Sequence, residues 1–391
     1  MLEPEDLVPV GEILRLIGGL PLGILLAAAW VDMLPVSEIA AEIAKSLDFL
    51  ETEMGDVPDR HRSLRAVFDY SCARLTHEER QTFLALSAFR GGFTREAAQA
   101  VAGASLRGLS TLANKSLVTP SPETGRYVVH ELLRQYGEAE LRQDTELSRP
   151  VDEAHAAFYG ALMKESLALF IGSDQPHAVR VVEQDLDNVR SAWRYYLAAG
   201  DAAAARSFVE GLWYLYEFRG WYPAGIALFG EALEALPAHS DDGEVVKLRA
   251  LAGAVQAWFM SLVGQPEAGE AAARNATDTL HDSLDLDARM TSAQCHAVSL
   301  AYLGRMEEMA ACMEEAMAVA DAGVSAQQPF TDNRPIKDIA AEALDDLRDA
   351  LSPEEYSAAR ARGTSTPFEV AAKELMIASV KRQGDRGFPD P

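Results

Sequence analysis

Residues 117–136 have the sequence LVTPSPETGRYVVHELLRQY, and this stretch decides the fold. Two short runs rich in β-branched and other apolar residues, 117–119 and 126–129, flank a proline-containing turn that ends at Gly125. Such a pattern predicts a β-hairpin. We expect a helix to begin at His130, directly after the hairpin. The stretch therefore predicts a two-stranded wing that is followed by a helix.

Helical patterns precede the wing. Residues 63–74 form one predicted helix, and the residues Thr-His-Glu-Glu at 76–79 have the spacing of a capping box at the start of the next. Further helices are predicted from Thr94 and over 106–114. Helices followed by a two-stranded wing and a last helix have the order of a winged-helix domain, which we place at residues 57–146.

The net charge of the chain argues against a general nucleic-acid binder. Thirty-five basic and sixty acidic residues give a formal charge of -25, which repels nucleic acid and acidic membrane surfaces. Residues 59–144 differ, because twelve basic and ten acidic residues give them a net charge of +2. DNA binding by the winged helix stays open, but an even spread of charge is a poor footprint for phosphates.

The N-terminal segment predicts a helical hairpin. Residues 8–34 have the pattern of a helix, a Gly-Gly-Leu-Pro turn at 18–21 and a second helix, and Pro21 takes a first-turn position where its missing N–H costs nothing. We place a helical subdomain at residues 1–56. The apolar run 20–31 is shorter than the roughly 20 residues that span a bilayer.

Two further features of the sequence bear on the expected cellular location. The acidic first residues lack the basic region of a secretion signal. Cys72, Cys295 and Cys312 are too few and too scattered for a disulfide framework. We therefore expect a cytoplasmic protein that binds no membrane.

We predict a hinge at residues 144–150. Beyond residue 150 the sequence is rich in alanine and helical in pattern, and helix turns are predicted at Gly200, Gly220, Gly264 and Gly304. The spacing of large and small residues fits tetratricopeptide repeats, although the turns are further apart than the repeat length of about 34 residues. The predicted segments are a repeat array at 150–324, a helical pair at 325–380 and a disordered tail at 381–391. The fold class is therefore mainly α: a helical hairpin and a winged-helix domain, followed by an α-solenoid.

A dense aromatic stripe marks one predicted helix of the array. Trp213, Tyr214, Phe218 and Trp221 are our candidates for partner binding in a concave groove, with Tyr214 and Phe218 on one helix face. The alternative is that the stripe is solenoid core.

Catalytic motifs are absent from the sequence. It contains no Gly-Lys dipeptide and hence no Walker A motif, no His-Glu-x-x-His and no Gly-x-Ser-x-Gly. The eight histidines are dispersed. We expect no metal, no catalytic residue and no enzyme activity of this chain.

Several motifs together resemble the C-terminal part of bacterial STAND-class regulators, which are signalling ATPases with an NB-ARC-type nucleotide module and a helical repeat sensor. The resemblance is strong through the first half of the chain and weak beyond about residue 324. The motifs that carry it are GLPL at 19–22, RSLRAVFDYS at 62–71, LSAFRGGFT at 86–94, NKSLV at 114–118, RYVVHELLRQY at 126–136 and DLDNVRSA at 185–192.

The resemblance assigns roles to two residues. It implies that Pro21 lines the adenine side of a nucleotide and that His130 contacts the diphosphate in the resting state. The family's P-loop domain has no counterpart in these 391 residues. The resemblance therefore implies that ADP or ATP binds only together with a separate P-loop protein. A structural role for His130, as a helix cap or a wing contact, is the alternative.

Three functions are consistent with these observations. The first is a signalling or transcription-regulator fragment, whose repeats bind a protein or a small-molecule inducer and whose winged-helix arm relays the bound state. The second is half of a split ATPase, in which a P-loop partner supplies the phosphate chemistry. The third is a DNA-binding winged helix.

Overall fold

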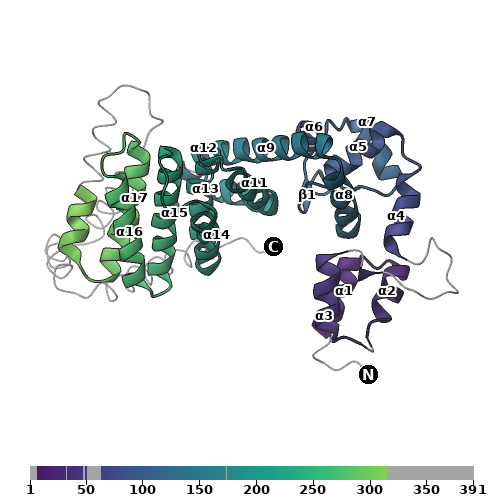
Figure 1. Ribbon diagram of the computed structural model, residues 1–391, viewed down its shortest axis with the longest axis horizontal. Coiled ribbons are helices and arrows are strands. Elements are labelled where there is room, and N and C mark those ends of the chain that lie inside the picture. Colours follow the sequence, from purple (N-terminus) through teal and green to yellow (C-terminus); the bar gives the residue numbers. More distant parts are fainter. Residues whose placement is uncertain (1–6, 32, 47–48, 51–62, 173, 315–391) are drawn as a thin grey trace, which may run out of the picture. The chain divides into compact units, whose positions relative to one another are not determined.

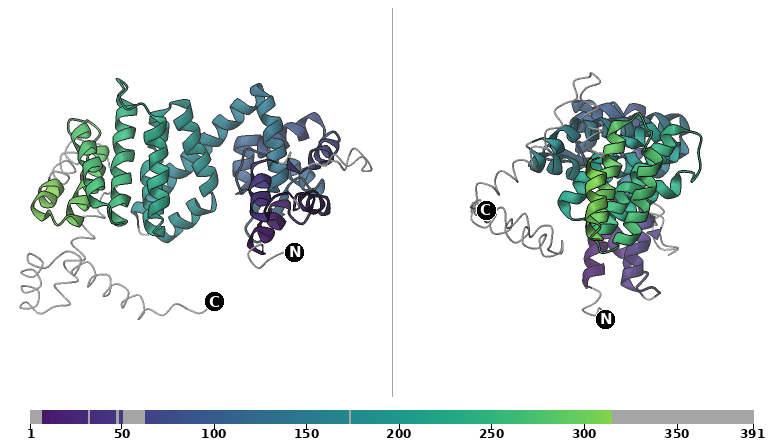
Figure 2. Two further views of the ribbon diagram at one scale, coloured as in Figure 1. Left: turned by 60° about the horizontal axis from the view of Figure 1, so that its bottom comes forward. Right: turned by 90° about the vertical axis from the view of Figure 1, so that its left-hand side faces the viewer.

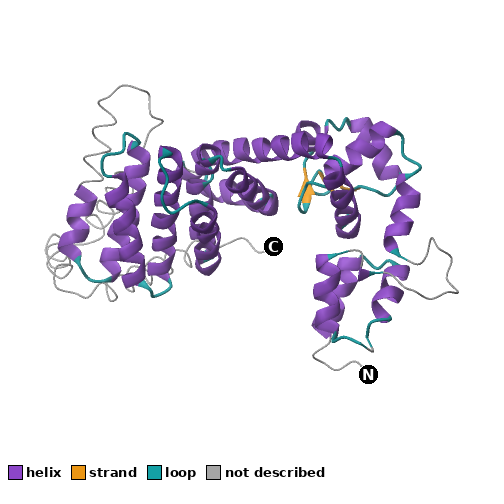
Figure 3. Ribbon diagram, viewed as in Figure 1, coloured by secondary structure: helices purple, strands orange, loops and turns teal. Residues whose placement is uncertain are grey.

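The computed structural model describes residues 7–31, 33–46, 49–50, 63–172 and 174–314. The predicted C-terminal helical pair and tail lie outside these residues. The described part contains seventeen helices and one three-stranded sheet, which confirms the mainly α fold class (Figures 1 and 3). It forms two compact units. The first unit holds described residues of 1–163 and 180–196, and the second unit holds those of 164–179 and 197–314.

Three short helices open the first unit: α1 (Leu7–Ile17), α2 (Pro21–Ala28) and α3 (Val36–Lys45). The turn between α1 and α2 uses Gly18 and Gly19 in left-handed backbone conformation, with φ of +62° and +70°. Pro21 begins α2, as predicted. Ile17 of α1 and Ile39 and Ile43 of α3 are fully buried where these helices pack.

Side-chain caps define the next helices, and their bounds are close to the predicted ones. Ser63, Thr76, Thr94 and Ser105 each accept a hydrogen bond from a backbone N–H in the first turn. The capping box between Thr76 and Glu79 is present as predicted. The helices are α4 (Leu64–Cys72), α5 (His77–Leu86), α6 (Arg95–Ala102), α7 (Leu106–Asn114) and α8 (Glu131–Gln143).

The predicted hairpin forms from β2 (Thr119–Ser121) and β3 (Arg126–Val128), which pair antiparallel. A strand that we did not predict, β1 (Gly92–Phe93), pairs with the other side of β3, so the sheet order is β1-β3-β2 (Figure 3). The loop before β1 thereby joins the sheet.

The helix α8 packs closely on α5. Gly137 of α8 lies against Ser87, and a Cβ atom at this glycine would overlap the Ser87 side chain. Ser87 is completely buried, and its hydroxyl donates a hydrogen bond to the backbone oxygen of Phe83. The absent side chain at Gly137 therefore sets how near the two helices approach.

The polar stretch at 144–150 differs from our expectation of a hinge. Asp144 ends α8, and its carboxylate accepts a hydrogen bond from the backbone N–H of Leu147, at 3.1 Å. This cap starts α9 (Thr145–Ile171) at once, with Pro150 inside the helix. The helices α10 (Gln175–Gln184) and α11 (Leu186–Ala199) follow.

Antiparallel helices form the second unit (Figure 2). Left-handed glycines stand at the predicted turns, with φ of +71° at Gly200, +66° at Gly220, +84° at Gly264 and +72° at Gly304. The helices are α12 (Ala202–Arg206), α13 (Val209–Arg219), α14 (Tyr222–Ala235), α15 (Gly243–Leu262), α16 (Pro266–Leu280) and α17 (Leu286–Tyr302).

Large residues on one helix fill space left by small residues on the next. Gly225 of α14 lies against the ring of Phe259 in α15, so closely that a Cβ atom would come within 2.6 Å of the ring. The helix α15 is long and apolar enough to cross a membrane, but it packs against α14, α16 and α17 as the core helix of the array.

Candidate functional site

The structure brings the glycine turn of residues 18–21 and His130 together, although they are more than 100 residues apart in sequence. The ring of His130 lies on the Cα atom of Gly18, and a Cβ atom at this glycine would overlap Nε2 of the ring. The contact lies within the first unit, where α1 packs on α8. The contact therefore joins the glycine turn before Pro21 to His130, the two segments to which the resemblance assigned nucleotide contacts.

His130 also caps α8. Its Nδ1 accepts a hydrogen bond from the backbone N–H of Leu132 at 3.3 Å, so the neutral ring carries its proton on Nε2, the nitrogen that lies at Gly18. Burial lowers the pKa of His130 below its ordinary value, with Glu131 opposing this effect. Near neutral pH the ring is an uncharged donor at the glycine turn.

Pro21 lies on an exposed apolar surface beside this contact. Pro21 itself is exposed, and neighbouring α2 side chains also face solvent: Leu20 is 37% exposed, Ile24 is 38% exposed and Leu25 is 69% exposed. Side chains four residues apart are neighbours on a helix, so these residues form one patch. Patches of this kind mark surfaces that interact with a protein or a ligand.

A buried polar cluster fixes the wing. Arg126 of β3 donates two hydrogen bonds to the carboxylate of Asp185, from Nη1 at 3.0 Å and from Nη2 at 2.6 Å. The Arg126 and Asp185 side chains are only 12% and 10% exposed. The Tyr159 hydroxyl of α9 donates to the same carboxylate at 3.1 Å. Strand β3, helix α9 and the junction of α10 with α11 therefore meet at Asp185.

Asn188 extends this cluster to β1 and the loop before it. Its side-chain oxygen accepts a hydrogen bond from the backbone N–H of Arg90 at 2.6 Å, and its nitrogen donates to the backbone oxygen of Gly92 at 3.2 Å. The Nε2 atom of His155 lies 3.4 Å from the side-chain oxygen of Asn188. Both Asn188 and His155 are buried. We call Arg126, Asp185, Asn188, Tyr159 and His155 the wing clamp.

Only part of the wing clamp was recognised from the sequence. The DLDNVRSA motif at 185–192 was quoted for the resemblance, and the structure places residues 180–196 in the first unit. Tyr159, His155 and Arg126 were not singled out as partners of Asp185. A charged residue in a short strand was a signal, but its partner lies 59 residues later, beyond the reach of local patterns.

The aromatic stripe divides between core and surface. Trp213 is only 5% exposed and packs edge-on against Trp258, with ring centroids 5.1 Å apart. Tyr214 and Phe218 both pack on the buried Phe170, and Phe218 is 47% exposed. Trp221 packs edge-on against Tyr216.

A half-buried carboxylate lies next to this stripe. The Trp258 Nε1–H donates a hydrogen bond to Glu217 at 2.7 Å, and burial raises the pKa of Glu217. Phe218 is therefore the exposed ring of this stripe, while Tyr214, Glu217 and Trp221 are partly exposed. Within the described residues no group of three or more His, Cys, Asp or Glu side chains is arranged to hold a metal ion.

Comparison with known proteins finds relatives that match part of this chain. No family model matches the chain. A protein of Mycobacterium tuberculosis that is named as an HTH-type transcriptional regulator is 32% identical over 234 residues, which cover 58% of this chain and 26% of the relative. An uncharacterized protein of the same species is 32% identical over 152 residues, covering 36% of this chain and 39% of that protein. The chain thus spans about a quarter to two fifths of the length of these relatives.

Among solved structures, the chain has a likeness to a STAND protein with a tetratricopeptide repeat sensor from Pyrococcus horikoshii. The sequence identity is 16% and the TM-score is 0.34, over 75% of this chain and 46% of that one. The likeness is too weak to support an inference.

The wing clamp predicts an asymmetry between two neighbouring aspartates. Asp185→Asn removes the partner of a buried guanidinium and should destabilise the first unit by about 3–5 kcal/mol. Asp187→Asn removes an exposed ion pair with Arg190, at 3.4 Å, and should cost less than about 1 kcal/mol. Urea unfolding measures both. Equal losses would contradict the clamp.

His155 predicts a pH dependence of stability. Burial lowers the pKa of His155 to about 4, well below its ordinary value near 6.5. Between these values the unfolded chain binds a proton that the folded chain does not, so the free energy of unfolding should fall by up to about 3 kcal/mol as pH drops from 6.5 to 4.

The measurement is urea unfolding across this pH range, compared with that of His155→Gln, which should lack this part of the fall. His239→Gln is the matched control, because an exposed side chain is hydrated in the folded and the unfolded chain alike. A fall of the same size in His155→Gln would refute the assignment.

Proposed function

We propose that this chain is a non-catalytic signal-relay part of a STAND-type transcription regulator. In this proposal the second unit binds a protein partner or a small-molecule inducer, and the first unit relays the bound state through a winged-helix arm. The observation that carries the proposal is the contact between His130 and Gly18. It joins the two motifs by which the sequence resembles that class.

The order of elements in the first unit supports the relay role. Helix α5, strand β1, helices α6 and α7, the β2–β3 hairpin and α8 follow the order of a winged helix. His130 lies two residues after β3 and caps α8, so a change at the glycine turn acts on α8 directly. The regulator name of the mycobacterial relative is consistent with this assignment.

The second unit supports binding of a partner. Helix pairs of a repeat array leave one surface of each layer for recognition. Phe218 exposes an aromatic face beside Glu217, whose raised pKa reports an incompletely compensated carboxylate. Exposed aromatics next to half-buried polar groups are typical of recognition surfaces.

A second candidate, the partner half of a split ATPase, is favoured by the exposed apolar patch around Pro21. A separate P-loop protein that docked on Leu20, Ile24 and Leu25 would cover this patch. The glycine turn and the Nε2 atom of His130 would then face the same partner.

The relay is tested by two neighbouring glycines. Gly18→Ala and Gly19→Ala both force an alanine into a left-handed conformation, at a cost of about 1–2 kcal/mol each. Only Gly18→Ala displaces His130, because a Cβ atom at Gly19 meets nothing within 4 Å. We expect hydrogen exchange at the first turn of α8 to accelerate about tenfold or more in Gly18→Ala alone. Identical exchange in the two variants would end the relay proposal.

The split-ATPase candidate is tested by isothermal titration of the chain with ADP and ATP in the presence of Mg²⁺. Micromolar binding that His130→Ala abolishes would show that the half-site of Pro21 and His130 works even without its P-loop partner, and would favour this candidate. The relay proposal expects no heat from the chain alone, because the phosphate-binding loop is supplied by another domain. Binding that survives in His130→Ala would contradict the role of this histidine in either candidate.

A further inference from the structure

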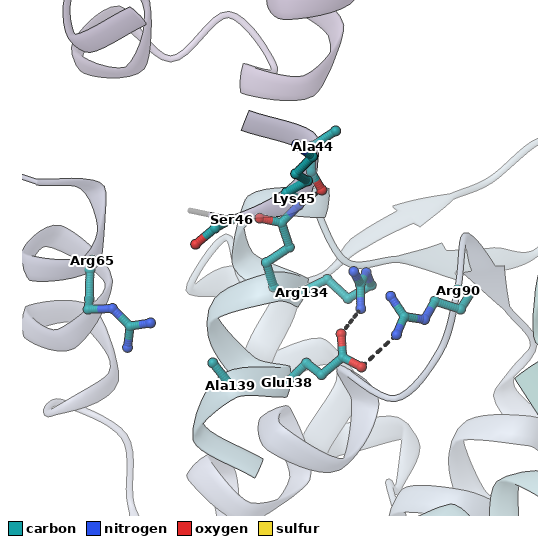
Figure 4. A pocket seen from close by; sticks show the side chains of 9 residues that line it. Ala44, Lys45, Ser46, Arg65, Arg90, Arg134, Glu138 and Ala139 are labelled. Atoms are coloured by element: carbon teal, nitrogen blue, oxygen red, sulfur yellow. Dashed lines mark hydrogen bonds and ion pairs between the residues drawn. The ribbon is translucent and has the colours of Figure 1, made fainter. Parts of the chain in front are cut away.

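A cavity of about 330 Å³ lies in the first unit, apart from the His130 contact (Figure 4). The end of α3, the first turn of α4, the loop after α5 and the middle of α8 form its walls. Figure 4 shows Arg65 on one side of the space and Arg90, Arg134 and Glu138 on the other. The charged side chains that line it are Lys45, Arg65, Arg90, Arg134 and Glu138.

Four cationic side chains thus share a wall with a single carboxylate. Glu138 accepts hydrogen bonds from two guanidinium groups, from Arg134 at 2.6 Å and from Arg90 at 2.5 Å. Arg134, Arg65 and Lys45 also pair with Glu131, Glu140 and Glu42, which do not line the cavity. Among the described residues Arg90 therefore has Glu138 as its carboxylate partner, and shares it with Arg134. Arg134 is buried and is also bonded to Glu131, which leaves Arg90 with the smaller share of compensation.

The guanidinium of Arg90 has further N–H groups that can donate hydrogen bonds. Only its Nη2 atom donates a side-chain bond among the described residues, and the Arg90 side chain is 39% exposed. Burial and then the neighbouring Arg134 guanidinium lower the pKa of Arg90. Arginine nevertheless stays charged at neutral pH. Two guanidiniums that face each other in this way are stabilised by an added anion.

Gln135 provides an acceptor on the same wall. Its Nε2 atom donates to the backbone oxygen of Ala44 and to Glu131, each at 3.2 Å, and these two acceptors fix the orientation of the amide. Its Oε1 atom is buried and has no hydrogen-bond partner in the part of the chain that the structure describes. Buried acceptors without a donor are rare, so a missing donor is expected here.

We propose that this cavity binds a phosphate-type oxyanion, held by Lys45, Arg65 and Arg90. Guanidinium forks match the oxygen geometry of phosphate, and the lysine adds a point charge. In a chain with a net charge of -25, such a cationic cavity is an exception to the general surface.

The position of the cavity gives the anion a structural consequence. Lys45 is the last residue of α3, whereas Arg90 and Arg134 belong to the helical core around the wing. An anion that binds all of them links the N-terminal helices to α8. The site therefore acts on the same packing as the His130 contact but uses different residues, and it does not depend on the proposed function.

The test is thermal unfolding of the whole chain with rising inorganic phosphate, at an ionic strength held constant with chloride. We expect a saturable rise in Tm that Lys45→Gln/Arg65→Gln strongly reduces. Each lost charge-assisted contact should weaken phosphate binding about tenfold, so the double variant should bind roughly a hundredfold more weakly.

Arg149→Gln is the matched control, because Arg149 is 81% exposed and pairs with Glu153, at 2.8 Å, away from the cavity-lining residues. It should keep the wild-type response. Circular dichroism at 25 °C confirms that the variants fold. No rise in Tm for the wild type, or an equal rise in the double variant, would overturn the site.

Two further arms separate the sources of the phosphate group and the two sites. Glycerol 3-phosphate that bound more tightly than inorganic phosphate would identify an organic phosphomonoester as the ligand, and the reverse order would identify the free ion. His130→Ala should retain the full response to phosphate. Loss of the response in that variant would assign the anion to the glycine turn and refute a separate site.

Discussion

The ion pair between Arg126 and Asp185 is the interaction on which the first unit depends. Two charges that are almost removed from water are stable only if their hydrogen bonds are complete, because desolvation costs several kcal/mol per ion. Tyr159 and Asn188 complete the bonds of Asp185, and the Gly92 backbone oxygen accepts a further bond from Arg126. Strands β2 and β3 of the wing are each three residues long, and a hairpin of this size would be only marginally stable alone. The clamp gives it a fixed position.

The clamp and the His130 contact act at opposite ends of one short segment. Arg126 begins β3, which ends at Val128, and His130 caps α8 two residues later. One end is therefore held by α9–α11 and the other by the glycine turn before α2. A segment of five residues that is anchored at both ends transmits a displacement with little loss, because it contains no flexible loop. This anchoring at both ends is the physical argument for the relay role that we propose for the first unit.

Features that depend on residues close together in the sequence were predictable, and features that depend on contacts between distant residues were not. The capping box at Thr76, the turn at Gly18 and the hairpin before His130 each depend on residues within a few positions of one another, and all three are present. We did not predict strand β1, because a run of two residues shows no periodicity. It forms a strand only by pairing with β3. The hinge expected at 144–150 is helical because the Asp144 side chain caps α9.

The candidate site divides in the same way. Pro21 and His130 were named from motifs, and the structure adds that the turn and the ring touch. The partners of Asp185 and the cationic cavity were not foreseen, because each assembles side chains from four segments. Composition even pointed away from the cavity, since the acidic excess of the whole chain conceals a local excess of guanidinium groups.

The close packing of α5 on α8 has a consequence for how this sequence can change in evolution. Ser87 occupies the space that a Cβ atom of Gly137 would need. A residue larger than glycine at position 137 is therefore tolerated only if position 87 is smaller than serine, so that the two positions should covary among homologues. Substitutions at positions 87 and 137 are therefore expected to be coupled, although these positions are fifty residues apart in the chain.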